Sequence, residues 1–177
     1  MRRELTRERL QDLMIELARS APHSRSYRVY IGGGGTAVHL GWRESTIDAD
    51  LHADHEGVFR HIQAIKERLQ MNVEFVKPED FVPPLAGSDD RHLFIQTVGK
   101  VSFYHHDPYA QLLSKIVRGF RRDLDDARNF LESDMVDAKR FRSLVHRIPE
   151  TAYARYPALS RQAVVHAVDD FLQQIRS

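Results

Sequence analysis

A strand that alternates apolar and acidic residues constrains this chain more than any other feature. In the run Thr46–His52, apolar residues alternate with Asp48, Asp50 and His52. Alternate side chains of a strand point to the same face, about 6.6 Å apart, so the two carboxylates share one face and the apolar residues share the other. Two like charges side by side are costly without a cation. The run therefore predicts a partly buried strand whose acidic face binds a divalent metal; the alternative is a solvated strand face.

Four consecutive glycines, Gly32–Gly35, precede this strand. Residues Tyr27–Ile31 are typical of a short strand, and Thr36–Leu40 are typical of a helix that ends near Gly41. Glycines between a strand and a helix let the backbone approach a ligand, and the N–H groups at a helix start attract anions such as phosphate. The spacing matches neither the P-loop nor the dinucleotide-binding Gly-x-Gly-x-x-Gly pattern. Taken alone, the run fits a phosphate site or a flexible turn.

The remaining patterns predict an α/β protein with a helical C-terminal region. Helical and strand patterns alternate up to residue 106. Helices are expected over residues 3–19 and Val58–Leu69, and a strand is expected at Asn72–Val76. A long proline-rich loop at Lys77–Asp90 follows, and then a hairpin of His92–Gln96 with Lys100–His105. Asp107 can cap a helix that has Pro108 at its first position. Three more helices are expected near Asp123–Leu131, Val136–Val145 and Ser160–Ile175. We expect a mixed sheet flanked by helices in residues 1–106, and a helical region packed on it in residues 107–177.

Composition excludes several classes of protein. The 177 residues include no cysteine, which removes disulfides and thiolate metal sites. No apolar run approaches the roughly 20 residues that a membrane span needs, and the N-terminus lacks the apolar core of a secretory signal. We therefore expect a cytoplasmic protein without a membrane partner. The 26 basic and 25 acidic residues nearly balance, so only local clustering of charge bears on nucleic acid.

Such clustering occurs in the predicted helix that follows Pro108. Lys115, Arg118, Arg121 and Arg122 fall mostly on one helical face or in the turn after it, which suits phosphate or an RNA backbone. The alternative is a solvated basic face. Lys115 stands apart because its neighbours in the helix are apolar.

Two histidine pairs, at His52 and His55 and at His105 and His106, have unconvincing spacing for transition-metal ligands. Ten histidines in one chain produce such pairs by chance. We expect His52 to line the carboxylate site or to bond a neighbour. At a strand end, only one of His105 and His106 is expected to face inward.

Together these motifs resemble the DNA polymerase β-like nucleotidyltransferase superfamily, whose signature is a Gly-Gly or Gly-Ser turn, a short helix and a strand with Asp-x-Asp. The run Gly34-Gly35-Thr36-Ala37, followed by Arg43-x-Ser45-Thr46-x-Asp48-x-Asp50-Leu51, is especially similar to the abortive-infection (AbiEii-type) toxin nucleotidyltransferases. Downstream, the Lys-containing helix and Arg-Asp-x-x-Asp helix of that group are matched by Asp107-Pro108, Lys115, Arg118 and Arg122-Asp123-Leu124-x-Asp126-Ala127. The resemblance covers about residues 27–131.

The resemblance implies transfer of a nucleoside monophosphate from a nucleoside triphosphate. Asp48 and Asp50 would hold Mg²⁺ or Mn²⁺, and Lys115 would meet phosphate charge. The other residues implied in nucleotide or phosphate binding are Gly34, Gly35, Thr36, Arg43, Ser45, Thr46, Arg118 and Arg122. Metal ions and cations of this kind neutralise the triphosphate and the departing pyrophosphate.

A third carboxylate, on a later strand, commonly activates the attacking hydroxyl in this superfamily. Glu74 is the candidate, because Val73 and Phe75 would face the core while Glu74 faces the site. The alternative is an ordinary exposed strand residue.

The expected acceptor is an RNA, tRNA in particular, or a protein, and the resemblance adds a toxin role with a cognate antitoxin. Two other functions remain open from the sequence. One is a catalytically silent nucleotidyltransferase fold that binds nucleotide, RNA or a partner protein; the other is a general RNA-binding module that uses the arginine cluster without chemistry.

Overall fold

The computed structural model describes residues 2–176, which form two compact units. Unit 1 comprises the residues up to Lys77 together with His92–His106, and unit 2 comprises Pro78–Arg91 together with the residues from Asp107 onward. Each unit is built from two separate stretches of chain. Within residues 2–176, every helix is too short or too polar to span a bilayer.

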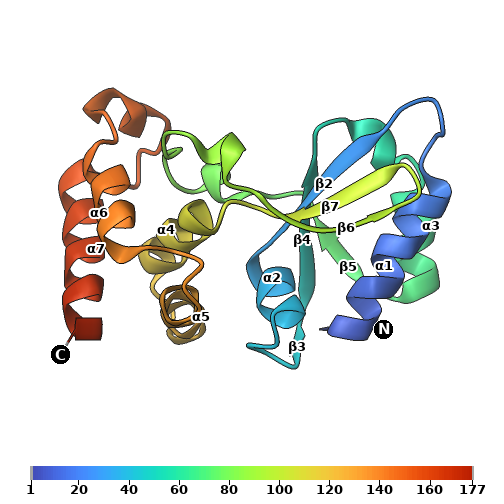
Figure 1. The fold of residues 1–177 in the computed structure, drawn as a ribbon, viewed down its shortest axis with the longest axis horizontal. Coiled ribbons are helices and arrows are strands. Elements are labelled where there is room, and N and C mark those ends of the chain that lie inside the picture. Colours follow the sequence, from blue (N-terminus) through green and yellow to red (C-terminus); the bar gives the residue numbers. More distant parts are fainter. Residues whose placement is uncertain (1, 177) are drawn as a thin grey trace. The chain divides into compact units, whose positions relative to one another are not determined.

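Unit 1 is the α/β part, and its helices and the strands of its larger sheet follow the expected order (Figure 1). The expected helix over residues 3–19 starts only at Arg7, because Leu5–Thr6 form a short strand. The elements of unit 1 are β1 (Leu5–Thr6), α1 (Arg7–Ser20), β2 (Tyr27–Gly32), α2 (Gly33–His39), β3 (Ser45–Thr46), β4 (Asp48–Ala53), α3 (Ile62–Leu69), β5 (Asn72–Glu74), β6 (Leu93–Val98) and β7 (Val101–His105). A two-stranded sheet pairs β1 with β3, and a five-stranded sheet has the order β5-β4-β2-β7-β6. Strand β2 runs antiparallel to β4 and parallel to β7, so the sheet is mixed, as predicted.

The core of unit 1 lies between one face of the five-stranded sheet and helices α1 and α3. Helix α1 starts at the N-cap Thr6, whose hydroxyl accepts the Arg9 N–H, and its apolar stripe includes Leu10, Leu13 and Leu17. Against these residues pack the inward residues of four strands, namely Tyr27, Val29 and Ile31 of β2, Ala49 and Leu51 of β4, Val73 of β5, and Val101 and Phe103 of β7; Ile95 and Val98 of β6 are partly buried against the same core. The polar residues that alternate with them therefore lie on the opposite face of the sheet.

Unit 2 is a set of helices with a looped segment. The helices are α4 (Pro108–Arg118), α5 (Arg121–Glu132), α6 (Ala138–His146) and α7 (Arg161–Arg176). Helix α4 packs on α5 and α7, and α6 packs on α7. As predicted, Asp107 is the N-cap of α4 and Pro108 is at the helix start. All four helices carry an amphipathic pattern, which explains why the sequence locates them.

The segment Pro78–Arg91 belongs with these helices, although the sequence places it in the α/β part. A 3₁₀ turn at Pro78–Asp80 packs against α4, and the Tyr156 hydroxyl donates to the Glu79 carbonyl oxygen at 2.6 Å. Val82 and Leu85 are buried. Contacts between residues distant in sequence therefore decide where this loop packs.

Candidate active site on strand β4

Strand β4 presents two carboxylates on the face opposite the core. Ala49 and Leu51 are 0% and 1% exposed, whereas Asp48, Asp50 and His52 are partly exposed. The alternation predicted from the sequence is thus realised from Asp48 to His52. It was wrong for Ile47, which is 59% exposed, because the chain leaves the strand between β3 and β4 at this residue. Asp48 and Asp50 stand two residues apart on the same strand face.

Antiparallel pairing of β2 with β4 places the glycine turn next to Asp50. Gly32, the last residue of β2, lies opposite Asp50, and helix α2 begins at Gly33. Gly33 has φ of +56°, and a Cβ atom built there would lie 2.3 Å from Asp50 Oδ2. A side chain at position 33 would collide with the carboxylate, so the turn and Asp50 meet only because this residue is glycine.

Gly34 and Gly35 are needed for equally close internal packing. A Cβ on Gly34 would lie 2.0 Å from the hydroxyl oxygen of Thr46, which is 8% exposed, and a Cβ on Gly35 would lie 2.9 Å from Ile31 Cγ2. These glycines therefore let the backbone approach its own chain. Gly33–Gly35 thus form the start of α2, earlier than the helix start expected at Thr36, and they are held tightly against Thr46 and Asp50.

Glu74 shares the acidic face. Strand β5 runs parallel to β4 and places Glu74 opposite Asp50, while Val73 lies opposite Ala49 and is 7% exposed. Three carboxylates thus lie on neighbouring positions of one sheet face. Among residues 2–176, no group of three or more His, Cys, Asp or Glu side chains is gathered closely enough to hold a metal ion.

Phe75 corrects the sequence prediction. It was expected to face the core, but it is 52% exposed and its ring lies 4.8 Å from that of Phe59. Strand β5 ends at Glu74, so the alternation of the strand does not extend to Phe75.

Two of the predicted phosphate-binding side chains, those of Thr36 and Ser45, already make hydrogen bonds within unit 1. Thr36 is fully buried, and its hydroxyl donates to the Ile31 carbonyl oxygen at 3.1 Å. Ser45 donates to Glu4 Oε2 at 2.9 Å. Arg43 lines a hollow of about 520 Å³ beside Trp42, at the start of α1. Thr36 and Ser45 hold elements in place, and Thr46 supports the glycine turn.

A chain of hydrogen bonds attaches α2 to the sheet. Thr36 Oγ1 lies 3.0 Å from His105 Nδ1, and His105 Nε2 lies 3.2 Å from His39 Nδ1. Because the Thr36 hydroxyl donates to Ile31, it accepts from His105 Nδ1–H, and His105 Nε2 accepts from His39 Nδ1–H. Burial, and secondarily the nearby His39, lowers the pKa of His105 to about 3, so His105 stays neutral.

His106 is buried as well, at 4% exposed, although its ring is not part of the hydrophobic core of unit 1. It belongs to an aromatic cluster centred on Tyr30, which the sequence did not reveal. Ring centroids lie 4.8 Å apart for Tyr30 and His52, 4.4 Å for Tyr30 and His92, 5.6 Å for Tyr30 and Tyr104, and 4.6 Å for His92 and His106. Tyr30 pairs with His52 across β2 and β4, so this cluster continues the face that carries Asp50.

Lys115, in unit 2, takes part in a buried ion-pair network. Its Nζ lies 2.9 Å from Asp126 Oδ2 and 3.5 Å from Asp123 Oδ1, and its side chain is 8% exposed. Arg118 Nε lies 3.5 Å from the other oxygen of Asp123. Arg122 is exposed at the start of α5. The Lys-containing helix and the Arg-Asp-x-x-Asp helix are therefore joined by their own motif residues.

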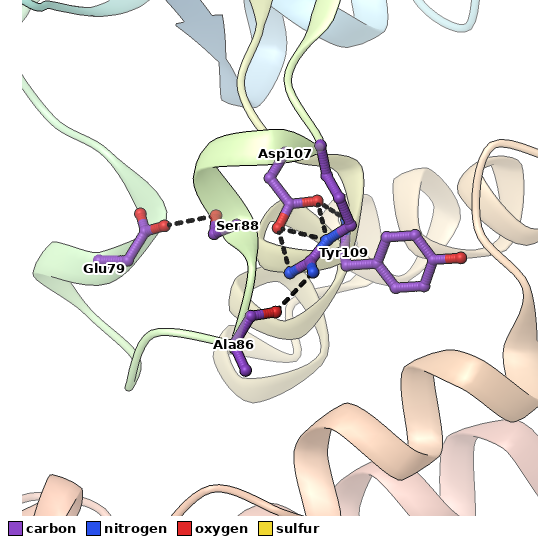
Figure 2. Close-up of polar contacts among 6 residues, drawn as sticks. Glu79, Ala86, Ser88, Asp107 and Tyr109 are labelled. Atoms are coloured by element: carbon purple, nitrogen blue, oxygen red, sulfur yellow. Dashed lines mark hydrogen bonds and ion pairs between the residues drawn. The ribbon is translucent and has the colours of Figure 1, made fainter.

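A second buried ion pair connects the loop of unit 2 to α4 (Figure 2). Arg91 donates through Nε and Nη2 to the carboxylate of Asp107, with a shortest distance of 2.9 Å, and through Nη1 to the Ala86 carbonyl oxygen at 2.6 Å. Asp107 Oδ1 also accepts the Tyr109 N–H at 3.0 Å, and the Arg91 guanidinium lies 5.3 Å from the centroid of the Tyr109 ring. The Asp107 side chain is fully buried and that of Arg91 is 9% exposed. One carboxylate thus caps α4 and fixes residues 86–91.

The fold and the arrangement of this site are typical of one class of protein. A glycine turn, a short helix and a carboxylate-bearing strand of a mixed sheet are the features of the nucleotidyltransferase superfamily. The chain belongs to the family described as "Nucleotidyltransferase of unknown function (DUF6036)", whose model matches residues 8–176. No curated protein and no solved structure matches the chain.

Proposed function

We propose that this protein is a metal-dependent nucleotidyltransferase that moves a nucleoside monophosphate from a nucleoside triphosphate to an RNA or protein acceptor. The observation that carries this proposal is the contact of the glycine turn with the acidic strand, in which Gly33 meets Asp50. A triphosphate on that turn would bring its charged oxygens beside carboxylates, an arrangement that is favourable only with a cation between them.

The residues present fit a hard divalent cation. Asp48 and Asp50 offer carboxylate oxygens on one strand face, which suit Mg²⁺ or Mn²⁺. Protein sites commonly hold Mg²⁺ through one or two carboxylates plus phosphates of the substrate. Asp48 and Asp50 would hold the ion, and when bound it would neutralise charge on the transferred phosphate.

The remaining roles fall to residues of the chain itself. Glu74, level with Asp50 on the neighbouring strand, would take the proton of the attacking acceptor hydroxyl. The backbone of Gly34 and Gly35 would position the triphosphate. Positive charge for the phosphates is assigned by family resemblance to Arg43, Lys115, Arg118 and Arg122.

A more specific proposal concerns the biological role of this protein. The similarity to AbiEii-type toxins supports a tRNA acceptor and a cognate antitoxin as partner, and it rests on analogy. A toxin of this kind would arrest growth when expressed alone. Growth restored by Asp48→Asn would connect the arrest to the carboxylate site.

Transfer of label from each of the four α-³²P nucleotides tests the main proposal, with Mg²⁺ and with total tRNA and the protein itself as acceptors. Asp48→Asn and Asp50→Asn keep the size of the side chain and remove the charge that retains the metal, so transfer should fall to background while the circular dichroism spectrum is unchanged. Glu67→Gln, an exposed acid on α3, is the matched control and should retain transfer. Full activity of either aspartate variant would remove the basis of the proposal.

Glu74→Gln should behave differently. Loss of a general base slows the chemical step by about 100-fold or more without loss of metal or nucleotide affinity. Calorimetric titration with nucleotide and Mg²⁺ should therefore give unchanged binding beside slow transfer. Unchanged transfer would make Glu74 an ordinary exposed strand residue.

A second candidate function is a binding module without chemistry. The aromatic cluster around Tyr30 favours it, because aromatic side chains bind bases by stacking without any reaction. This function predicts nucleotide or RNA binding that survives Asp48→Asn and no transfer under any condition.

A further inference from the structure

Unit 1 contains a pocket that none of the assigned roles uses. It has a volume of about 460 Å³ and is lined by His52, Ala53, Glu56, Phe59, Ile62 and Phe75. Pockets that bind small organic ligands occupy roughly 300–1,000 Å³ and have mostly apolar walls with a few polar groups. This pocket matches that description, since its walls are aromatic or aliphatic apart from His52 and Glu56.

The pocket lies beyond the carboxylates along β4. His52 follows Asp50 by two residues on the same strand face, about 6.6 Å further on. Phe75 directly follows Glu74 at the end of β5. Because β2 is antiparallel to β4, the glycine turn meets β4 at its other end, near Thr46 and Asp50. Along β4, the glycine turn and the carboxylates therefore lie side by side from Thr46 to Asp50, and the pocket begins beyond them, at His52 and Ala53.

This order has a chemical consequence. In nucleotidyl transfer the acceptor oxygen attacks the phosphorus while the bond to the pyrophosphate oxygen breaks, and the two oxygens lie roughly in line on opposite sides. The acceptor proton passes to the base, and pyrophosphate leaves with the electron pair of the broken bond. If the glycine turn holds the pyrophosphate side, the acceptor hydroxyl must arrive from the side of His52, Glu74 and Phe75.

We propose that this pocket, resting on the proposed function, binds the terminal nucleobase of an RNA acceptor. The Phe59 and Phe75 rings, 4.8 Å apart and inclined by 50°, offer an aromatic wall, and half-exposed Phe75 is available for stacking. His52 is itself stacked on Tyr30 at 4.8 Å, so its ring is held in place. The Glu56 carboxylate repels phosphate and can accept hydrogen bonds from a base amino group, which favours a base over the triphosphate of the donor.

The experiment uses a 12-nucleotide RNA that carries 2-aminopurine as its 3′-terminal base, with the intact protein. Stacking on an aromatic ring quenches the fluorescence of this base. Wild-type protein should quench it, and Phe75→Ala should weaken RNA binding by about tenfold, the size expected for one lost base stack. Phe75→Trp should retain quenching. Phe94→Ala is the matched control, because Phe94 is a 61% exposed aromatic residue of the same sheet outside the pocket.

Donor binding is measured in parallel with a fluorescent ATP analogue and Mg²⁺, and it should be unchanged in Phe75→Ala. Equal RNA binding by wild-type protein and Phe75→Ala would overturn the pocket assignment. So would a loss confined to the ATP analogue, which would place the donor base there, or a loss confined to transfer onto protein, which would indicate a protein acceptor.

These failures differ from failure of the proposed function. A protein that transfers label but shows no dependence of RNA binding on Phe75 loses only the pocket proposal. A protein that transfers no label to any acceptor loses both proposals.

Discussion

Gly33 and Gly41 share an unusual backbone and differ in their surroundings. Both have positive φ, +56° for Gly33 and +79° for Gly41, where a side chain is strained. A Cβ at Gly33 would lie 2.3 Å from the Asp50 carboxylate, whereas a Cβ at Gly41 would have no atom within 4 Å. Only at Gly33 would substitution also displace a proposed metal ligand.

We therefore expect different results from Gly33→Ala and Gly41→Ala. Each should cost about 1–2 kcal/mol of unfolding free energy through backbone strain, measured by urea denaturation. Gly33→Ala should additionally abolish Mg²⁺-dependent nucleotide binding in calorimetry, and Gly41→Ala should preserve it. Equal nucleotide affinity in the two variants would show that the contact between Gly33 and Asp50 has no role in binding.

Helix α2 is fixed to the sheet by groups that must stay uncharged. The folded pKa of His105 is about 3, well below its ordinary value of 6.5, because burial disfavours the charged ring. Below pH 6.5 the unfolded chain gains a proton that the folded chain does not, so stability is full above pH 6.5 and decreases as the pH falls toward 3. Each such site contributes at most about 1.4 kcal/mol per pH unit in that window.

Urea unfolding at pH 5 and pH 7.5 checks this dependence. The wild-type protein should be less stable at pH 5, and His105→Gln should show a smaller difference between the two pH values. His23→Gln replaces an exposed loop histidine and should leave the difference unchanged. An identical pH dependence for His105→Gln and the wild type would contradict the assignment of His105 as a neutral buried group.

The start of α4 depends on the Asp107 carboxylate, which binds both Arg91 and the Tyr109 N–H. Removal of one member of a buried ion pair leaves the other charge uncompensated, so Arg91→Ala should cost about 3–5 kcal/mol of stability. Arg91→Lys should recover little, since an ammonium cannot bind Asp107 and Ala86 with the planar geometry of a guanidinium. Arg128→Ala, which removes an exposed pair with Asp125, should cost less than about 1 kcal/mol. Thermal and urea unfolding compare the three variants, and a cost for Arg91→Ala no greater than that of Arg128→Ala would show that the pair contributes no stability.

The sequence predicted an element correctly where neighbouring residues alone determine its structure. Asp107 and Pro108 predict the start of α4 because capping involves only neighbouring residues. Alternation predicts the face of Asp48 and Asp50, since it depends only on strand geometry. The prediction that Phe75 faces the core was wrong, because alternation does not show where a strand ends.

Features made by distant residues could not be predicted. The hydrogen-bond chain from Thr36 to His105 and the aromatic cluster around Tyr30 require the strand order β4-β2-β7, which no single segment contains. The position of residues 78–91 depends on Arg91 and on the hydrogen bond from Tyr156 to Glu79. Features that depend on contacts between residues distant in sequence therefore could not be predicted from local sequence patterns.

The division into two units also divides the predicted nucleotide-binding residues. Asp48, Asp50 and Glu74 belong to unit 1, and Lys115, Arg118 and Arg122 belong to unit 2. Participation of unit 2 in nucleotide binding is therefore a separate hypothesis, and Lys115 is the residue that tests it. A simple truncation is ambiguous, because Lys115 also neutralises Asp123 and Asp126.

A paired substitution separates these two roles of Lys115. Lys115→Met alone should cost about 3–5 kcal/mol of stability, because it removes a cation that lies 2.9 Å from the buried Asp126 carboxylate. Lys115→Met combined with Asp126→Asn should recover most of that loss, while Asp123 keeps its contact with Arg118. If Lys115 meets phosphate charge, the stable double variant should still bind nucleoside triphosphate about tenfold or more weakly, as expected for one lost charged contact. Calorimetry on Asp126→Asn alone controls for the second change, and wild-type affinity in the double variant would make Lys115 a purely structural residue of unit 2.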